Sequence, residues 1–147
     1  MAFTGSFMAT SFKKELATAT HNFAASGGHS FKIALYDNSA TLTAATTGYT
    51  SSGELAGSGG YTTTGQVLAS NIDPATSGTT AFWSWSANPS WTSATFTAYG
   101  ALIYNDTSSG DKAVAVLDFG GAKSVSSGTF TIVLPTNDAS NAILRIA

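Results

Sequence analysis

Apolar side chains recur at every second position over much of the chain after residue 30. The segment 31–36 is the first such run, and 129–134 is a late one. Successive side chains of a strand point to opposite faces of a sheet, so a period of two is typical of a strand with one buried face. Turn residues rather than helical patterns separate the runs. Strands are expected at residues 31–36, 61–72, 80–85, 92–104, 113–119, 129–134 and 142–146.

This succession of strands predicts a mainly β fold, an antiparallel β-sandwich or a jelly-roll-like fold. The length of 147 residues suits one domain, because a single core fills that size. Within the single domain 1–147, we expect an N-terminal arm and helix at 1–28 and the sandwich at 29–147. Residues 38–60 are mostly Ser, Thr, Gly and Ala and predict a long loop, a kind of segment that is usually functional or ordered by a partner.

One short helix is expected before the strands, at residues 11–23. Its apolar side chains recur at steps of four, three and four residues, the spacing of one helical face: Phe12, Leu16, Ala19 and Phe23. Ser11 is a suitable N-cap because its hydroxyl can accept a hydrogen bond from a free amide of the first turn. The glycine pair at 27–28 follows and is expected to end the helical segment.

Composition restricts the classes of partner. The net charge is −2 and only 10% of residues are charged, so the chain lacks the basic surplus that binds nucleic acid or anionic membranes. It contains no cysteine, which excludes disulfides and the zinc or iron–sulfur sites that rely on cysteine sulfur. We find neither an apolar run of about 18 residues nor a signal-like N-terminus. The sequence therefore predicts no nucleic-acid or membrane partner.

Few residues are candidates for catalysis. His21 and His29 are the only histidines, and the carboxylates are isolated along the chain. A histidine needs a nucleophile and an orienting carboxylate beside it to work in a dyad or triad, and no Gly-x-Ser-x-Gly segment occurs. Residues 105–111 offer oxygen ligands and a glycine, but a hairpin turn explains them better than a calcium loop. We expect no enzyme, no cofactor and no metal site.

The three tryptophans are the most distinctive side chains. Trp83 and Trp85 are two residues apart in an expected strand, so both should project from the same face. Two coplanar indoles on an open face could stack on sugar rings, which makes a carbohydrate-binding module one interpretation. The other interpretation is a core position or a contact with another subunit, where tryptophan is enriched.

Six segments of the sequence are similar to segments of known proteins: 11–16 (SFKKEL), 31–36 (FKIALY), 60–62 (GYT), 98–105 (AYGALIYN), 113–120 (AVAVLDFG) and 141–146 (NAILRI). Together they resemble a family of short tailed-bacteriophage virion structural proteins associated with the capsid. The resemblance spans nearly the whole chain and carries no catalytic signature. It implies a virion protein assembled in the host cytoplasm, and we expect a decoration or cement protein that binds the major capsid protein and stabilises the head.

Such a protein is expected to form a small cyclic homo-oligomer, with a trimer favoured. The candidate subunit contacts are the large apolar residues of the N-terminal arm, the 38–60 loop and the tryptophans: Phe3, Phe7, Met8, Tyr49, Leu55, Trp83, Trp85 and Trp91. Two alternatives remain open at this point. One is a tail, neck or adaptor protein of the same virion, and the other is a carbohydrate-binding module that uses Trp83 and Trp85.

Overall fold

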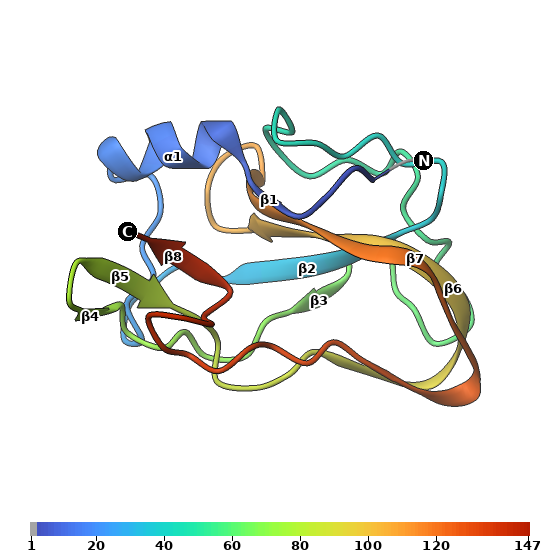
Figure 1. The fold of residues 1–147 in the computed structure, drawn as a ribbon. Coiled ribbons are helices and arrows are strands. Elements are labelled where there is room, and N and C mark those ends of the chain that lie inside the picture. Colours follow the sequence, from blue (N-terminus) through green and yellow to red (C-terminus); the bar gives the residue numbers. More distant parts are fainter. Residues whose placement is uncertain (1–2) are drawn as a thin grey trace.

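A computed structural model describes residues 3–147, so that only Met1 and Ala2 of the predicted N-terminal arm lie outside it (Figure 1). The described chain is mostly β, with two antiparallel sheets and one short helix. This confirms the prediction of a mainly β, sandwich-like fold with a short N-terminal helix.

The larger sheet has five strands in the order β1-β7-β6-β2-β3. Their bounds are β1 Phe7–Met8, β7 Lys112–Thr131, β6 Ser90–Asn105, β2 Phe31–Tyr36 and β3 Gln66–Val67. The smaller sheet has the order β4-β5-β8, with β4 at Ala75–Ser77, β5 at Thr80–Trp83 and β8 at Leu144–Ile146. The helix α1 spans Thr10–Ala17. The small sheet lies beside the start of β2 (Figure 1).

The β6–β7 hairpin contains the two longest strands of the described residues. The sequence predicted separate strands at 113–119 and 129–134, whereas β7 is continuous from Lys112 to Thr131. Between the pairs Gly100–Asp118 and Ala98–Lys123, β7 advances five residues while β6 advances two. Gly120 and Gly121 absorb this bulge with φ angles of 69° and 131°, which L-residues rarely adopt.

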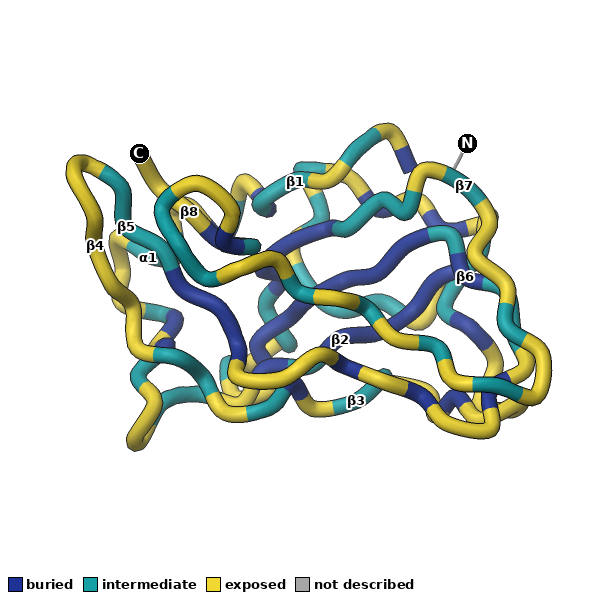
Figure 2. Tube along the Cα trace, turned by 60° about the horizontal axis from the view of Figure 1, so that its bottom comes forward, coloured by how far each residue is buried: buried dark blue, intermediate teal, exposed yellow. Residues whose placement is uncertain are grey.

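The bulge divides the hairpin into two halves. The half nearer the turn pairs with β2 and β1 in the middle of the large sheet. The other half, β6 residues 90–98 with β7 residues 123–131, curves away from the sheet, and we call it the distal ribbon (Figure 1). Most of its residues are exposed or half-buried, whereas β2 and the half of the hairpin nearer the turn are mostly buried (Figure 2). The distal ribbon is therefore largely exposed, and its buried residues are Trp91, Ala94 and Ala98.

Strand β2 is buried on both faces, although its alternation predicted only one buried face. Ala34 and Tyr36 are as inaccessible as Ile33 and Leu35 on the opposite face. The 38–60 loop supplies the second cover, because the Tyr36 hydroxyl donates to Thr50 O at 2.7 Å. Throughout 38–60, every residue of which is described, no strand forms, although isolated bridges join Glu54 to Tyr36 and Gly48 to Lys112.

Two local predictions are wrong at their boundaries. The helix ends at Ala17 rather than at residue 23, because Ala19 adopts a left-handed φ of 55°. The predicted N-cap Ser11 lies inside the helix, and Ala9 occupies the cap position. The predicted strand 61–72 shrinks to Gln66–Val67, because Gly65 N donates to Thr62 O and closes a turn.

Candidate functional site

The eight candidate contact residues divide into two groups. Five are buried within the chain's own fold, with exposed fractions between 3% and 9%: Phe3, Leu55, Trp83, Trp85 and Trp91. The other three, Phe7, Met8 and Tyr49, are half-buried. The prediction of surface contacts is therefore corrected for the first group, whose side chains complete the core. Phe7 and Met8 lie in β1, at the edge of the large sheet.

Trp83 and Trp85 do share a face, but this face points into the core. Trp83 lies 5.4 Å from Phe23 between ring centroids, and Trp85 lies 5.7 Å from Phe31. Phe23 stacks on Phe31 at 4.3 Å. With exposed fractions of 5% and 3%, the two indoles have no open face for a sugar ring. The core interpretation is correct, and the carbohydrate-binding interpretation loses the surface that it required.

Trp91 belongs to a second aromatic cluster on the distal ribbon. Its ring lies 5.9 Å from Phe130, and Phe130 in turn lies 5.2 Å from Phe96 and 6.2 Å from Phe119. Tyr61, from the loop that follows the 38–60 segment, packs against Trp91 at 6.4 Å. Trp91 is buried, whereas the three phenylalanines are half-exposed. The cluster therefore presents one side to solvent.

A groove of about 330 Å³ opens on this exposed side. It is lined by three half-exposed apolar side chains and two exposed polar ones, and we call it the ribbon groove: Phe119, Phe130 and Ile132, with Lys123 and Thr131. Exposed apolar surface that clusters in this way is typical of sites that bind another protein. The groove suits an apolar side chain of a partner, and Lys123 at its rim suits a nearby acidic group.

A buried polar network lies below α1. Glu15 Oε2 is 2.8 Å from His21 Nε2, and His21 Nδ1 is 3.0 Å from Asn105 Nδ2. The same Asn105 nitrogen is 2.9 Å from His29 Nδ1. The sequence favoured no catalytic role for either histidine, and in the structure the His21 side chain is fully buried. No local spacing signals this network, because 84 residues separate His21 from Asn105.

A second network fastens the 38–60 loop. The Glu54 carboxylate accepts hydrogen bonds from the hydroxyls of Tyr49 and Tyr61 and from Thr64 N, each at 2.6 Å. Burial and the Glu54 carboxylate raise the pKa of Tyr49 to about 12 and raise that of Tyr61 further. These tyrosines therefore remain protonated donors at neutral pH. Tyr49, a candidate contact residue, has its hydroxyl occupied within the chain.

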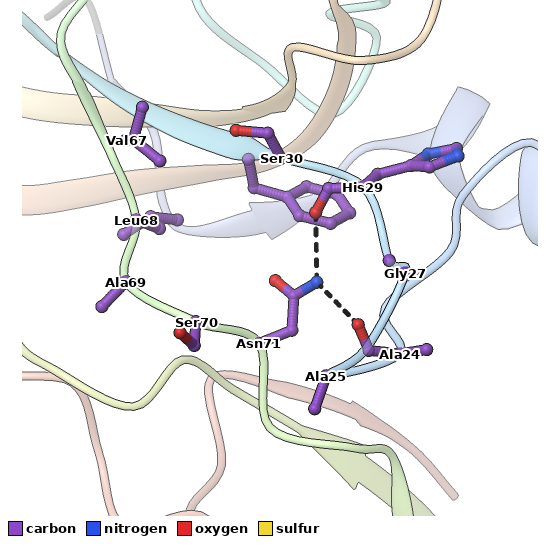
Figure 3. A pocket seen from close by; sticks show the side chains of 12 residues that line it. Ala24, Ala25, Gly27, His29, Ser30, Val67, Leu68, Ala69, Ser70 and Asn71 are labelled. Carbon is purple, nitrogen blue, oxygen red and sulfur yellow. Dashed lines mark hydrogen bonds between the residues drawn. The ribbon is translucent and has the colours of Figure 1, made fainter.

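A polar pocket of about 310 Å³ lies between the loop before β2 and the segment after β3 (Figure 3). Asn71 spans its floor, and its amide nitrogen donates to Ala24 O at 3.2 Å and His29 O at 3.1 Å. The side chain of His29 points away from Asn71 (Figure 3). The polar atoms that Asn71 offers are thus used to hold two segments of the chain together.

The turn at 105–111 has the structural role that the sequence predicted. Asn105 Oδ1 accepts from Thr107 N at 3.0 Å and from Ser108 N at 3.2 Å, which closes the hairpin. Within residues 3–147, no three His, Asp or Glu side chains gather into a group that could hold a metal ion. Over the same residues, no helix has the length and apolar character needed to cross a membrane.

The chain was compared with protein-family models, curated proteins and solved structures, and no match was found in any of the three.

Proposed function

We propose that this protein is a structural subunit of a bacteriophage virion, a decoration or cement protein that binds the major capsid protein lattice. In this proposal, the protein acts by binding and not by catalysis. It assembles in the host cytoplasm as a small cyclic homo-oligomer, with a trimer favoured. Its role is to bridge capsid subunits and stabilise the head.

The ribbon groove is the observation that carries the proposal. Phe119, Phe130 and Ile132 keep part of their apolar surface open in this groove, on and beside the distal ribbon. A chain with 10% charged residues has few charges with which to attract a partner, so burial of apolar surface must supply much of the binding free energy. The resemblance of six segments to capsid-associated virion proteins supports the identity of the partner.

Copies of the chain are proposed to meet at the edge of the large sheet. Strand β1 pairs with β7 through Phe7–Val116 and Met8–Ala115, and it is the last strand of the sheet on that side. An edge strand can form main-chain hydrogen bonds with another chain. Phe7 and Met8, the two residues of β1, are half-buried, so their open surface can add apolar contact area.

The role is tested on particles with and without this protein. We expect particles that carry it to survive higher temperature and stronger dilution than particles that lack it, because a bridging subunit must detach before the shell opens. A reconstruction should place it on the head, in a fixed copy number relative to the capsid subunit. Equal resistance would overturn the cement role, and recovery from purified tails would favour the tail, neck or adaptor alternative.

The ribbon groove is tested by Ile132→Asp, with Val133→Asp as the matched control. Ile132 lines the groove, whereas its neighbour Val133 is 73% exposed and does not line it. We expect I132D to weaken binding to assembled capsids by about tenfold or more, because a charge would enter the apolar contact. V133D should bind like the unaltered chain. Equal binding by all three proteins in a co-sedimentation assay would exclude the groove as the capsid contact.

A further inference from the structure

The network of Glu15, His21, Asn105 and His29 fixes the protonation of both imidazoles. Asn105 Oδ1 accepts two main-chain hydrogen bonds, from Thr107 and Ser108, so its oxygen cannot exchange places with its nitrogen. Asn105 Nδ2 therefore faces both histidines, and an amide nitrogen only donates. Each histidine must accept at Nδ1, and each ring must carry its single proton on Nε2.

Protonation of either imidazole disrupts this arrangement. A second proton on Nδ1 of His21 or His29 would point at the N–H groups of Asn105 Nδ2, which lies within 3.0 Å of both rings. Asn105 is fully buried and its oxygen is occupied, so the carboxamide cannot turn to accept the new proton without losing the two bonds that close the turn. The neutral histidines and the intact turn therefore depend on each other.

The charged groups around His21 act in both directions. Burial is the largest influence and lowers the pKa of His21 below the ordinary value of 6.5. Glu15 on α1 opposes this effect, while His29 and Lys112 at the start of β7 add to it. Asp106, next to Asn105, is paired with Lys32 of β2 at 3.1 Å, and Asp73 accepts from Ala25 N at 2.7 Å. Glu15 is thus the carboxylate that directly contacts His21.

The histidines hold a segment that covers the core. His21 and His29 lie on either side of Phe23, whose ring stacks on Phe31 at 4.3 Å and contacts Trp83 and Trp85. Asn105 ties both ends of this segment to the end of β6. Within residues 21–29 these two bonds are the side-chain links to the hairpin turn, whereas the flanking Thr20 O and Ser30 N bond to Ser108 Oγ and Thr107 Oγ1.

We propose that the His21–Asn105–His29 bridge is an acid-sensitive contact that fastens segment 21–29 over the aromatic core at neutral pH and releases it when the imidazoles are protonated. The direction of the pH effect follows from the coupling between protonation and folding. A histidine with a lowered pKa in the folded state contributes stability that is complete above 6.5 and is lost as the pH falls below that value. This device is independent of the proposed virion role, because it concerns the fold of the isolated chain.

The first test reads the core tryptophans in a Trp91→Phe background, in which Trp83 and Trp85 are the remaining fluorophores. We expect a reversible shift of their emission to longer wavelength as the pH falls from about 7.5 to about 5, a range that lies above the ordinary pKa values of carboxylates. His21 and His29 are the only histidines, so no other imidazole can contribute to the shift. A constant emission over this range would overturn the proposal.

The matched variant is Asn105→Asp in the same background. The introduced carboxylate can still accept from Thr107 and Ser108, but its second oxygen accepts hydrogen bonds from protonated imidazoles instead of opposing them. We expect the acid-induced emission shift to be lost in N105D. The same pH dependence with and without N105D would contradict the role of Asn105.

If N105D does not fold, a measurement on the unaltered chain tests the protonation state that the bridge requires. The ¹⁵N chemical shifts of the imidazoles distinguish the Nε2–H tautomer, the Nδ1–H tautomer and the protonated ring. At neutral pH we expect both histidines to be neutral with the proton on Nε2. A proton on Nδ1 of either ring at neutral pH would overturn the proposal.

Discussion

Replacement of Phe31 by Ala should lower the free energy of unfolding by about 3–5 kcal/mol, the usual cost of removing a buried phenylalanine ring. Phe31 is 1% exposed and lies between Phe23, at 4.3 Å, and Trp85, at 5.7 Å. Its loss would leave a cavity where three parts of the chain meet: the segment after α1, β2, and the segment that follows β5. Urea unfolding followed by tryptophan fluorescence measures the change.

Two further variants separate the packing effect from a general sensitivity to mutation. Phe31→Leu retains most of the buried volume and should cost less than half as much as Phe31→Ala. Phe119→Ala removes the same ring from the half-exposed ribbon groove and should also cost less, because less surface returns to water. If F31A and F119A lower the free energy of unfolding equally, the aromatic cluster around Phe31 does not stabilise the chain more than the ribbon groove does.

Alternation in the sequence was sufficient to locate the central strands. The predicted strands at 31–36 and 92–104 agree with β2 and β6 because their large side chains are buried and alternate. The stretch 120–128 of β7 was missed because its sequence, GGAKSVSSG, carries one large apolar residue, Val125. Its strand geometry depends on pairing with β6, and no local pattern reports such pairing.

Sequence reasoning placed Trp83 and Trp85 on one face but did not decide between an open face and the core. The decision depends on Phe23, which comes from a segment 60 residues earlier in the chain. The helical pattern also misled at this point. Phe23 continued the apolar spacing of α1, but it reaches the core from a non-helical segment that follows the left-handed Ala19.

The polar network around Glu54 was also beyond prediction, although its partners lie close in the sequence. Glu54 was one of several isolated acids in the sequence. Its three donors belong to Tyr49, Tyr61 and Thr64, and only the folded loop brings them together. The 38–60 loop was expected to be functional or ordered by a partner, whereas this network orders it from within the chain.

Replacement of Glu54 by Ala should lower the free energy of unfolding by about 3 kcal/mol, because three donors lose a charged acceptor at once. One of them, Thr64 N, belongs to a β-branched residue with a φ of 72°, a strained conformation that the surroundings must hold. Tyr104 holds the other side of this residue by donating to Thr64 O at 2.6 Å. We therefore expect faster amide hydrogen exchange over residues 49–65 in E54A than in the unaltered chain.

Glu54→Gln and the alkaline titration of Tyr49 separate the charge from the contact. The introduced carboxamide retains one acceptor oxygen, so E54Q should lose about half as much stability as E54A. Burial and then Glu54 raise the pKa of Tyr49 from 10.0 to about 12, so the stability from this group is complete below pH 10.0 and is lost as the pH rises toward 12. E54Q should shift the tyrosinate absorbance of Tyr49 to lower pH, with Tyr49→Phe identifying its share of the signal. An unchanged titration would show that the carboxylate does not act on this hydroxyl. If E54A lost no more free energy of unfolding than Y49F, the network would contribute no more than a single hydrogen bond.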